Sequence, residues 1–373
     1  MSEFFFRTSD LSVGYNGKTL IRDIEIRVRA GEILTLIGPN GSGKSTILKS
    51  ITKHLTAIKG DSFIADASVN AMSYKELSKK LAVVLTERIK GELLTCWDVV
   101  STGRYPYTST LGLLSPEDRE KVQAAMVRVH ADELADKDFT AISDGQRQRV
   151  LLARAICQEP EIIVLDEPTS YLDIRHKLEL LEILRSMARE KGITVIMSLH
   201  EIDLAQKISD RIMCVKGDVI AHFGTPEDIF REDVISELYG LPRGAYDIRF
   251  GSVELPKPKG EPRVFVLCGG GSGAAVFRRL QREDTPFYAG VLQENDMDYP
   301  IALNLASEVY SDPPFMPLRE STCDRALAAM DTCDTVICTD FPIGEANRAV
   351  EKLIRAAEER GVLKRIGGGA SFD

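Results

Sequence analysis

The nine residues 38–46 decide the fold of this chain, and they read Gly38-Pro39-Asn40-Gly41-Ser42-Gly43-Lys44-Ser45-Thr46. An apolar strand is expected before them at 33–37, and a helical pattern opens at Thr46. The stretch fits G-x-x-x-x-G-K-[ST], in which glycines let backbone amides and a helix N-terminus surround a phosphate. Lys44 then reaches the β and γ phosphates, and Ser45 can ligate Mg²⁺. A turn that merely joins a strand to a helix needs no such lysine, so all nine residues are predicted to bind a nucleoside triphosphate.

A second informative segment is the apolar run 162–165, which ends in Asp166 and Glu167. Such a run predicts a buried parallel strand whose carboxyl end opens on a ligand crevice. Asp166 is placed to hold Mg²⁺ through water, and Glu167 to orient or deprotonate the attacking water. The same pattern also occurs where a strand simply enters a loop.

A third segment, Ile142-Ser143-Asp144-Gly145-Gln146-Arg147-Gln148-Arg149, leads into a helical stretch at 150–157. A serine and a glycine ahead of a helix make another anion-binding N-terminus. Here the chain resembles the ATP-binding cassette (ABC) ATPases, whose signature reads LSGGQ. The order of the other motifs also resembles that family: the phosphate loop, the signature, the Asp-Glu strand, a D-loop at Ser170-Tyr171-Leu172-Asp173, and His200 after the apolar strand 194–199.

The resemblance extends from near the N-terminus to about Leu255 and implies a role for each matched residue. Glu167 and His200 would be catalytic, and Asp173 would belong to the D-loop. Ser143, Asp144, Gly145 and Gln146 would contact the nucleotide of a second copy, which implies a homodimer. Tyr15 occupies the position where these ATPases stack an aromatic ring on adenine, although a half-buried sheet tyrosine would look the same.

Two positions depart from the family pattern. Asp144 stands where most members have glycine, so a backbone with positive φ would be strained there, and a carboxylate would approach the partner's phosphate. Thr86 aligns with the usual strand-end glutamine that touches Mg²⁺. Either its hydroxyl or the neighbouring Glu87 could replace that oxygen, and the sequence does not choose between them.

The composition narrows the class of protein. No window approaches eighteen uncharged apolar residues, and the first residues lack the features of a signal peptide. Seven cysteines without C-x-x-C pairs suggest reduced thiols in a cytoplasm. The formal net charge of −9 and the absence of a basic run argue against nucleic acid as the main partner. These features predict a soluble, cytoplasmic protein that is not exported, and the resemblance to ABC ATPases implies a peripheral position at the cytoplasmic face of the cell membrane.

The segment Thr102-Gly103-Arg104-Tyr105-Pro106-Tyr107, together with its continuation to residue 126, resembles the helical subdomain of the iron-siderophore, haem and cobalamin importers. The stretch LDEPTSYLDIR at 165–175 is also typical of that group. The resemblance implies an ATP-hydrolysing subunit that works with two transmembrane permease subunits and, indirectly, with a solute-binding protein. Trp97, Tyr105 and Tyr107 would then form the permease-docking surface, unless they pack the subdomain core. A regulatory ABC ATPase that does not power transport is the alternative.

The second part of the chain begins after a proline-rich and charged segment at 256–262, which reads as a stiff linker. The predicted fold is therefore α/β throughout. An ABC-type P-loop domain at 1–255, with a RecA-like core and a helical subdomain at about 88–157, precedes a small Rossmann-like domain at 263–373. In that second domain strands are expected near 264–268, 287–292, 308–310 and 335–339, and helices at 275–282 and 344–360.

The first strand of the second domain is followed by its own glycine-rich turn. Gly269, Gly271 and Ala274 fit G-x-G-x-x-[GA], and Gly273 adds a further glycine, so the turn is a weak candidate for a second nucleotide or phosphate site. The acidic residues after the next strand lie roughly where a ribose-binding carboxylate is expected; they are Glu294, Asp296 and Asp298. No catalytic constellation is visible there. A ligand-sensing or partner-docking role that gates the transporter is expected, with a structural spacer as the alternative.

Overall fold

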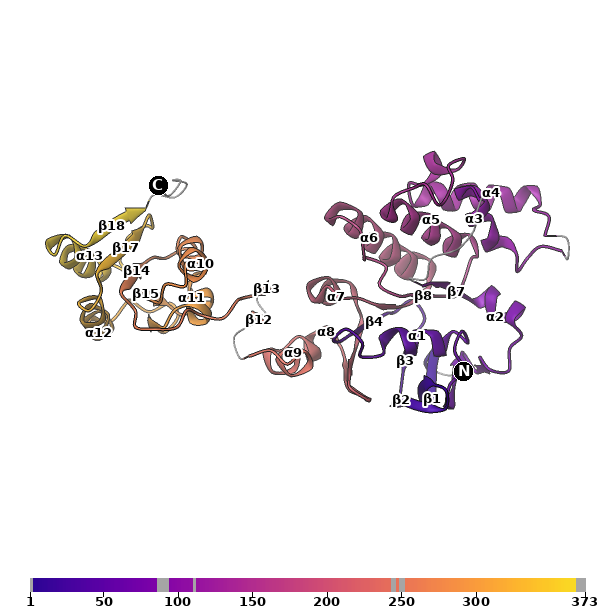
Figure 1. The fold of residues 1–373 in the computed structure, drawn as a ribbon, viewed down its shortest axis with the longest axis horizontal. Coiled ribbons are helices and arrows are strands. Elements are labelled where there is room, and N and C mark those ends of the chain that lie inside the picture. Colours follow the sequence, from indigo (N-terminus) through magenta and orange to yellow (C-terminus); the bar gives the residue numbers. More distant parts are fainter. Residues whose placement is uncertain (1–2, 86–93, 110–111, 243–245, 248–251, 367–373) are drawn as a thin grey trace. The chain divides into compact units, whose positions relative to one another are not determined.

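The computed structural model describes residues 3–85, 94–109, 112–242, 246–247 and 252–366. Its internal contacts divide the chain into two compact units, residues 1–240 and 241–373 (Figure 1). This division falls earlier than the boundary near Leu255 expected from the sequence, because Glu254 already pairs with Arg278 of the second unit. The functional extents of the two domains stay a prediction. Among the described residues, no helix has both the length and the apolarity that crossing a bilayer requires.

A six-stranded sheet forms the centre of the first unit, in the order β11-β10-β4-β9-β8-β7. Only β11 runs antiparallel to its neighbour. The strands span Ile33–Ile37 (β4), Leu81–Val84 (β7), Ile162–Leu165 (β8), Thr194–Ser198 (β9), Arg211–Lys216 (β10) and Val219–Gly224 (β11). Every residue of β4, β8 and β9 is buried, as a parallel sheet covered on both faces requires. The carboxyl ends of these three strands therefore meet at one edge, where the predicted site lies.

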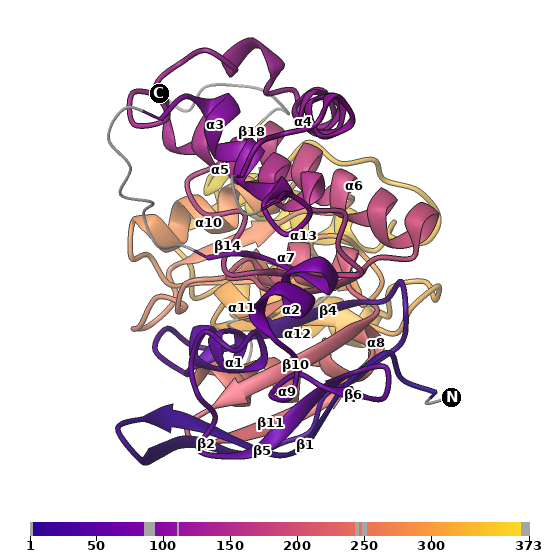
Figure 2. The ribbon, with the colours of Figure 1, turned by 90° about the vertical axis from the view of Figure 1, so that its right-hand side faces the viewer.

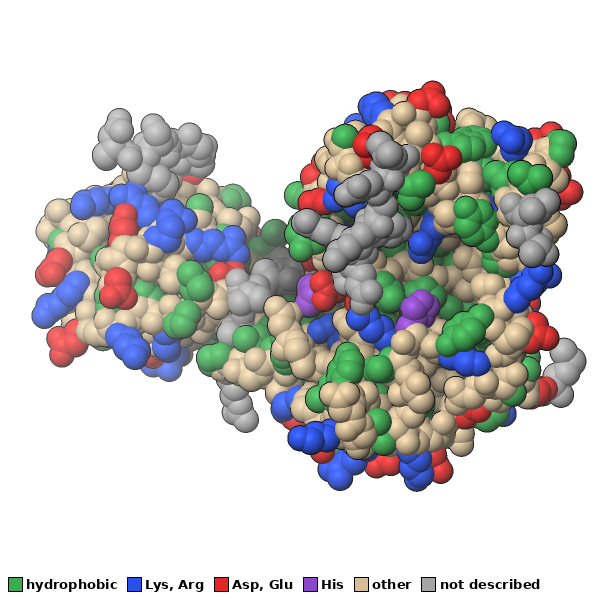
Figure 3. Space-filling model, turned by 45° about the vertical axis from the view of Figure 1, so that its right-hand side comes forward, with side chains coloured by type: hydrophobic (Ala, Val, Ile, Leu, Met, Phe, Trp, Pro, Cys, Tyr) green, Lys and Arg blue, Asp and Glu red, His purple; other side chains and the backbone are tan. Residues whose placement is uncertain are grey.

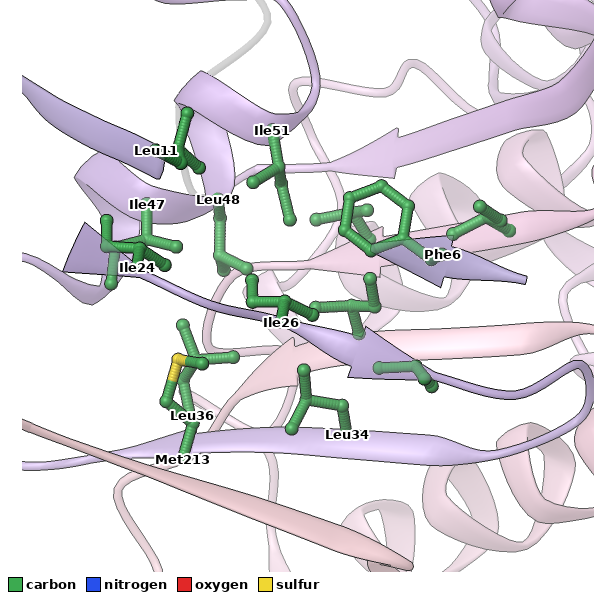
Figure 4. Close-up of a cluster of buried hydrophobic side chains, with 14 of the residues drawn as sticks. Phe6, Leu11, Ile24, Ile26, Leu34, Leu36, Ile47, Leu48, Ile51 and Met213 are labelled. Carbon is green, nitrogen blue, oxygen red and sulfur yellow. The ribbon is translucent and has the colours of Figure 1, made fainter. Parts of the chain in front are cut away.

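A second sheet, which is antiparallel, shares a hydrophobic core with the six-stranded sheet. It comprises β1 (Phe6–Tyr15), β2 (Lys18–Ile24), β3 (Arg27–Val28), β5 (Lys59–Ile64) and β6 (Ala67–Ser68). Helix α1 (Lys44–Ile51) packs between the two sheets through Ile47, Leu48 and Ile51 (Figure 4). Because α1 is the helix that comes directly after the phosphate loop, this apolar packing fixes the loop on the core.

The remaining helices of the first unit fall into two groups, which are a helical part and a set of helices that flank the sheets. Helices α3 (Cys96–Ser101), α4 (Pro116–Arg128) and α5 (Asp144–Cys157) contact one another and gather away from β1, β2 and β5, as Figure 2 shows. The short helices η1 (Thr102–Arg104) and η2 (Asp132–Leu134) belong to the same part. The flanking helices are α2 (Tyr74–Lys80), α6 (Ile174–Lys191), α7 (Ile202–Ile208), α8 (Pro226–Ile229) and α9 (Glu232–Tyr239).

The buried cluster at Arg104 fastens the helical part together. Its guanidinium donates to Asp118 of α4 at 2.9 Å and to the Cys157 carbonyl at the end of α5 at 2.8 Å. The guanidinium also donates to Glu159, and its Cζ atom lies 4.1 Å from the centroid of the Tyr107 ring. This one side chain therefore links η1, α4 and α5.

The second unit is a five-stranded parallel sheet in the order β16-β15-β14-β17-β18. The strands span Val264–Leu267 (β14), Phe287–Gln293 (β15), Glu308–Asp312 (β16), Thr335–Thr339 (β17) and Leu363–Ile366 (β18), with a small pair Tyr246–Asp247 (β12) and Ser252–Val253 (β13) ahead of them. One apolar core lies under α10 (Ala274–Arg282) and α11 (Tyr299–Leu305), and another under α12 (Glu320–Met330) and α13 (Val350–Glu359). The expected Rossmann-like α/β fold is confirmed, with the order reversing between β14 and β17.

Three element boundaries differ from the sequence expectation. The helix expected from Thr46 begins at Lys44, and the helix expected from Val150 begins at Asp144. The long helix expected at 344–360 is shorter, because Val350–Glu359 alone is helical and the side chain of Asn347 instead holds a turn to Pro342 and Gly344.

Candidate functional site

The phosphate loop joins β4 to α1 in a conformation that two of its glycines require. Gly38 has φ 148°, and a Cβ there would lie 2.2 Å from the Val215 carbonyl oxygen. Gly43 has φ 96°, and a Cβ there would lie 2.5 Å from Ile21 Cδ1. Side chains are excluded at both positions by strain and by backbone or core atoms. The backbone can therefore approach a ligand more closely than a loop with side chains could.

Lys44 lies folded over this loop. Its Nζ donates to the carbonyls of Gly38 at 2.8 Å and Pro39 at 3.0 Å, and the residue is 4% exposed. Burial lowers the pKa of Lys44, while the charges of Glu167 and Asp166 act in the opposite direction. The ammonium is thus held near two carboxylates without a direct ion pair to either among the described residues.

The loop also carries donors with no acceptor. The Ser42 amide donates to the Pro39 carbonyl at 3.2 Å, but no described side chain accepts a hydrogen bond from the amides of residues 41 and 43–45. The buried Ser42 hydroxyl also has no partner within the described structure. An orphaned buried hydroxyl, open amides and a lysine above a side-chain-free backbone match the donor set that a phosphate needs.

Asp166 and Glu167 come directly after β8, and a serine on the neighbouring strand orients both of them. The Ser198 hydroxyl donates to Asp166 Oδ1 at 2.8 Å and accepts from the Glu167 amide at 2.9 Å. Asp166 is 2% exposed, and burying a carboxylate without a hydrogen-bond partner costs free energy. The hydrogen bond from Ser198 reduces that cost and also fixes the direction of the carboxylate. Ser198 was not singled out from the sequence; its only signal was a hydroxyl at the end of the apolar strand 194–198.

Glu167 and His200 lie in direct contact, as a catalytic pair would. His200 Nε2 lies 2.5 Å from Glu167 Oε1. Ser170 donates to the other oxygen of Glu167 at 3.4 Å. Glu167 has φ 49°, a conformation uncommon for a residue with a side chain, so the loop directs this carboxylate away from Asp166 at some backbone cost.

A further network holds the loop after β9 against the loop after β8. Glu201 accepts from Thr169 at 2.8 Å and from Lys177 of α6. Burial alone would raise the pKa of Glu201, but the hydrogen bonds from Lys177 and Thr169 outweigh it, so that pKa is lowered. The ionised carboxylate keeps His200, its neighbour in sequence, at the edge of the site.

Magnesium fits this donor set. Mg²⁺ in nucleotide sites uses one or two protein oxygens together with phosphate oxygens. The Ser45 hydroxyl on the first turn of α1 and the Asp166 carboxylate are oxygens of that kind. Within the described residues, no three His, Cys, Asp or Glu side chains gather into an all-protein metal site.

The signature turn lies at the N-terminus of α5. The Ser143 hydroxyl accepts from the Gln146 amide at 3.3 Å, and the Gln146 side chain accepts from the Ser143 amide at 3.1 Å, which is a capping box. Ser143 and Asp144 are exposed. No hydrogen bond or ion pair between described residues joins this turn to the phosphate loop, so within one chain the two motifs remain separate.

The condition under which Asp144 would be strained, a positive φ, is not met in the structure. Asp144 is the first residue of α5 and does not have positive φ, because the helix begins here rather than at Val150. Its carboxylate pairs with Arg147 one turn on and suits the positive end of the helix dipole. The position with little room for a side chain is Gly145, where a Cβ would lie 3.2 Å from the Leu172 side chain of the D-loop.

Tyr15 and the D-loop also lie where a nucleotide site can use them. Tyr15 ends β1, is 50% exposed, and its hydroxyl lies 3.2 Å from the Thr46 hydroxyl. Asp173 caps α6 by accepting from the His176 amide at 3.0 Å. Beside it, Tyr171 is 84% exposed with φ 66°. Thr86 and Glu87, the candidate substitutes for the strand-end glutamine, lie outside the described residues.

The glycine turn of the second unit is occupied by its own carboxylates. Asp298 is fully buried and accepts from the amides of Gly271 at 3.1 Å, Gly273 at 2.9 Å and Ala274 at 3.0 Å. Asp296 accepts from the Gly270 amide at 2.9 Å. The carboxylates that the sequence suggested for a ribose thus occupy the phosphate position, and the turn offers no free amide nest to an anion. Gly269 contributes no donor either, because its amide donates to the Ser272 hydroxyl at 3.3 Å.

Two family models match the chain. The model of the ABC transporter family matches residues 21–170, and the model of the MJ0874 family matches residues 287–365. The first range contains the phosphate loop, the signature and the Asp-Glu strand. The second covers most of the parallel sheet of the second unit.

Two curated relatives align with different shares of the chain. The uncharacterized ABC transporter ATP-binding protein MJ0873 of Methanocaldococcus jannaschii is 41% identical over 275 residues, which are 74% of this chain and 95% of that protein. The cobalamin import ATP-binding protein BtuD of Halobacterium salinarum is 31% identical over 352 residues, which are 91% of this chain and 86% of that protein. The second alignment therefore extends into the second unit.

Solved structures support the fold of the first unit. A structure described as an inward-facing conformation of a putative metal-chelate type ABC transporter superposes with a TM-score of 0.57 at 25% identity, over 64% of this chain and 90% of that one. The dimeric post-hydrolysis state of the ATP-binding cassette MJ0796, bound to ADP and Pi, gives 0.54 at 25% identity, over 59% of this chain and 98% of that one.

Proposed function

Because the chain belongs to the ATP-binding proteins of the ABC transporter family, we propose that it is the subunit that hydrolyses ATP to energise uptake of a metal chelate through a membrane permease. The family relationship makes it an ATPase, homologous to the ATP-binding proteins of siderophore and cobalamin importers. The observation that carries the proposal is the meeting of Lys44, Asp166 and the Glu167–His200 pair at one sheet edge.

The reaction is the attack of water on the γ-phosphate of ATP, which yields ADP and phosphate. Lys44 leaves the carbonyls of Gly38 and Pro39 and binds the β and γ phosphates together with the open amides of the loop. Mg²⁺, when bound, neutralises phosphate charge, and Ser45 and Asp166 are the residues that would hold it. Tyr15 supplies a ring face for the adenine.

Glu167 and His200 act on the water. The Glu167 carboxylate orients the water and accepts its proton as the bond to phosphorus forms. His200, 2.5 Å from that carboxylate, keeps it aimed at the γ-phosphate. Ser198 holds the Glu167 backbone, so the base sits on a strand end rather than on a free loop.

Hydrolysis requires a second copy of this chain. Ser143, Gly145 and their helix N-terminus are exposed or half-buried and make no bond to the phosphate loop of their own chain in the described structure. Two exposed apolar side chains lie in the D-loop and directly after it, namely Tyr171 and Ile174. The ATP-binding cassette MJ0796, solved as a dimer bound to ADP and Pi, supports a dimer, in which we propose that each signature closes the other copy's site.

The membrane partnership is two permease subunits with an associated solute-binding protein, which places the chain at the cytoplasmic face of the membrane. Three aromatic residues were predicted to form the docking surface. Tyr105 is exposed and Trp97 is half-buried. The Tyr107 hydroxyl donates a hydrogen bond to the Gln158 carbonyl at 3.0 Å. Tyr105 is thus free to contact a partner, whereas Tyr107 also holds the helical part together.

Cobalamin is the favoured chelate among cobalamin, haem and iron-siderophore. The relative named for cobalamin import aligns with 91% of this chain and so includes the second unit. Relatives named for hydroxamate or achromobactin transport align with 63% and 62% of it. The second unit then has a gating role that does not use its glycine turn for a nucleotide.

Substitution Glu167→Gln tests the catalytic assignment. The purified variant should bind ATP normally, lose nearly all phosphate release, and accumulate as a nucleotide-bound dimer in size-exclusion chromatography. Glu190→Gln on the exposed face of α6 is the matched control and should behave as the parent protein. Normal turnover by Glu167→Gln would overturn the assignment. Co-purification with a polytopic membrane protein separates a transport subunit from a regulatory ABC ATPase.

A further inference from the structure

The second unit exposes apolar side chains at one edge of its parallel sheet. We call the residues that follow β14, β15, β16 and β17 the carboxyl edge; they are 268–273, 294–298, 313–319 and 340–349. Hydrophobic side chains reach the surface of the second unit on the face that Figure 3 shows. Residues 263–366, all of which the structure describes, expose five large hydrophobic side chains, and four of them lie at the carboxyl edge: Met297, Phe315, Met316 and Ile343. Such patches on a soluble domain mark interaction sites.

Backbone hydrogen bonds join the loops of this edge into one surface. The Phe315 amide, after β16, donates to Asn295 Oδ1, after β15, at 3.4 Å. The Leu318 amide donates to the Ala346 carbonyl at 2.9 Å, which joins the loop after β16 to the loop after β17. Phe315 is 85% exposed and has φ 60°, a conformation uncommon for a bulky residue. The apolar side chains are therefore held in place before a partner arrives, which lowers the entropy lost on binding.

The carboxyl edge is acidic. It carries five carboxylates and two arginines, whereas the rest of residues 263–366 carries 11 acidic and 10 basic residues. Asp296 and Asp298 already hold the glycine turn. The other three carboxylates are exposed, and their side chains have no hydrogen bond or ion pair within the described structure: Glu294, Asp340 and Glu345. A phosphate, a nucleic acid or an anionic lipid surface would meet like charge here, so the edge favours a cationic occupant.

The spacing of the apolar side chains fits an α-helix. The strand order β16-β15-β14-β17 places Phe315 at one end of the row, Met297 one strand further and Ile343 at the other end. Neighbouring strands lie about 4.8 Å apart, so the row spans about 14 Å. On a helix, side chains three or four residues apart are separated by about 5–6 Å, and ten residues rise about 15 Å. One apolar stripe on a helix laid across the strand ends would therefore meet all three loops.

We propose that the carboxyl edge of the second unit binds a cationic amphipathic helix of a partner protein. The apolar stripe of that helix packs on Met297, Phe315 and Ile343, and its Lys or Arg side chains face Glu294 and Asp340. A second copy of this edge is disfavoured as the occupant because it brings the same negative charge. The proposal does not depend on what the first unit energises.

The partner helix would also stabilise the glycine turn. Met297 lies between the two carboxylates that hold this turn, and Asp298 accepts from the amides of Gly271, Gly273 and Ala274. A helix packed on Met297 restricts the opening of those hydrogen bonds. Hydrogen exchange of the three amides should therefore slow when the helix binds.

Fluorescence anisotropy with the purified full chain tests the binding. The probe is a labelled amphipathic peptide of leucine and lysine, and its counterpart has glutamate in place of lysine. The parent protein should bind the lysine peptide and not the glutamate peptide, and its affinity should fall as salt rises. Phe315→Ala should weaken binding at least about tenfold. Leu303→Ala is the matched control, because Leu303 is also exposed but lies on α11 outside the edge. No binding of the lysine peptide, equal binding of both peptides, or equal weakening in the two variants would overturn the proposal.

Two aspartates of the same strand test the charges. Asp340 follows β17 and Asp334 precedes it, and both are exposed without a side-chain partner among the residues described. Asp340→Asn should weaken the lysine peptide about threefold and reduce the salt dependence, as loss of one surface ion pair does. Asp334→Asn should leave the affinity unchanged. Basal phosphate release should stay at the parent level in every variant, which shows that the protein is folded. Equal effects of the two substitutions would contradict binding at the carboxyl edge.

Thiol labelling locates the helix. All seven native cysteines are buried, so Met297→Cys and Leu303→Cys each carry one exposed thiol. A lysine peptide with a thiol-reactive group should label Met297→Cys at least about tenfold faster, because binding raises its local concentration there. Equal labelling rates would overturn the proposal. So would binding to phosphatidylglycerol vesicles, or self-association of the parent protein, that Phe315→Ala abolishes, since these would assign the edge to a membrane surface or to a second copy.

Discussion

The two units each contain a parallel strand, a glycine-rich turn and a helix, yet their turns are opposites in chemistry. In the first unit the amides of 41–45 meet no described side chain, and Lys44 lies over the loop. In the second unit the amides of Gly270, Gly271, Gly273 and Ala274 are bound by Asp296 and Asp298. The first turn is open to an anion, whereas the second already contains one that belongs to the chain.

The difference shows that glycine spacing alone does not make a phosphate site. Both turns have the backbone freedom, but the residues that face the amides differ: a cation over the first and two carboxylates over the second. An internal carboxylate fixes the turn and repels a phosphate by like charge. Substitutions of the charged side chains that face either turn should therefore change how differently the two turns bind an anion.

The largest effect is expected from Lys44→Ala. Loss of the only cation that lies on the open turn in the described structure should lower phosphate release at least about 100-fold, comparable with removal of one strong transition-state donor. ATP affinity, measured by titration calorimetry, should fall as well. Lys207→Ala on the exposed surface is the control. Unchanged ATP affinity in Lys44→Ala would mean that the two turns do not differ as described.

The second turn should respond to Asp298→Ala in stability and not in ATP hydrolysis. Removing a buried carboxylate that accepts three amide hydrogen bonds should destabilise the second unit by about 2–4 kcal/mol. The amides then become available, so sulfate should raise the unfolding temperature of Asp298→Ala more than that of the parent protein, at ionic strength matched with chloride. Equal responses to sulfate would show that the turn cannot act as a nest.

Two buried aspartates should give opposite pH dependences. Burial raises the pKa of Asp298, with the charge of Asp296 adding to it and the Gly273 amide opposing it. Its contribution to stability is complete below the unfolded value of 3.8 and is lost as pH rises through the folded pKa. For Asp118, burial is outweighed by hydrogen bonds from Ser115 and Arg104, so its pKa is lowered. Its contribution is present above 3.8 and is lost as pH falls through the folded pKa.

Asparagine variants test those slopes. Asp298→Asn should flatten the loss of stability on the alkaline side of pH 4, and Asp118→Asn should flatten the loss of stability on the acid side. Chemical unfolding curves between pH 3 and 7 provide the measurement. The same slope change in both variants would contradict the assigned directions.

The smallest effect is expected at the departure from the family signature. Asp144→Gly removes a carboxylate from the first turn of α5 and its ion pair with Arg147, which should cost about 0.5–1 kcal/mol of stability. Because Asp144 is exposed and has no positive φ, phosphate release should change less than about threefold. A larger gain in turnover would place the carboxylate against the second copy's phosphate.

The sequence predicted those features that lie in one continuous run. The phosphate loop, the Asp-Glu strand end and the signature are local motifs, and the α/β alternation of both units arises from apolar strands between helical patterns. The structure confirmed these elements, and it places Glu167 and His200 in contact. The failures lay at boundaries and at contacts. The start of the helix that contains Asp144 was placed six residues too late, and the helix at 344–360 was made too long.

Local pattern by itself indicated that this chain has two α/β folds, one of which carries the phosphate loop, the signature and the Asp-Glu strand end of an ABC ATPase. Only the tertiary structure decided which turn is open, because Asp298 lies well beyond its glycine turn in sequence and reaches it through the packing of β14 against β15. The same holds for Ser198, which meets Asp166 across neighbouring strands. Hydrogen bonds and charges act between side chains that folding brings together, and a linear pattern does not specify that proximity.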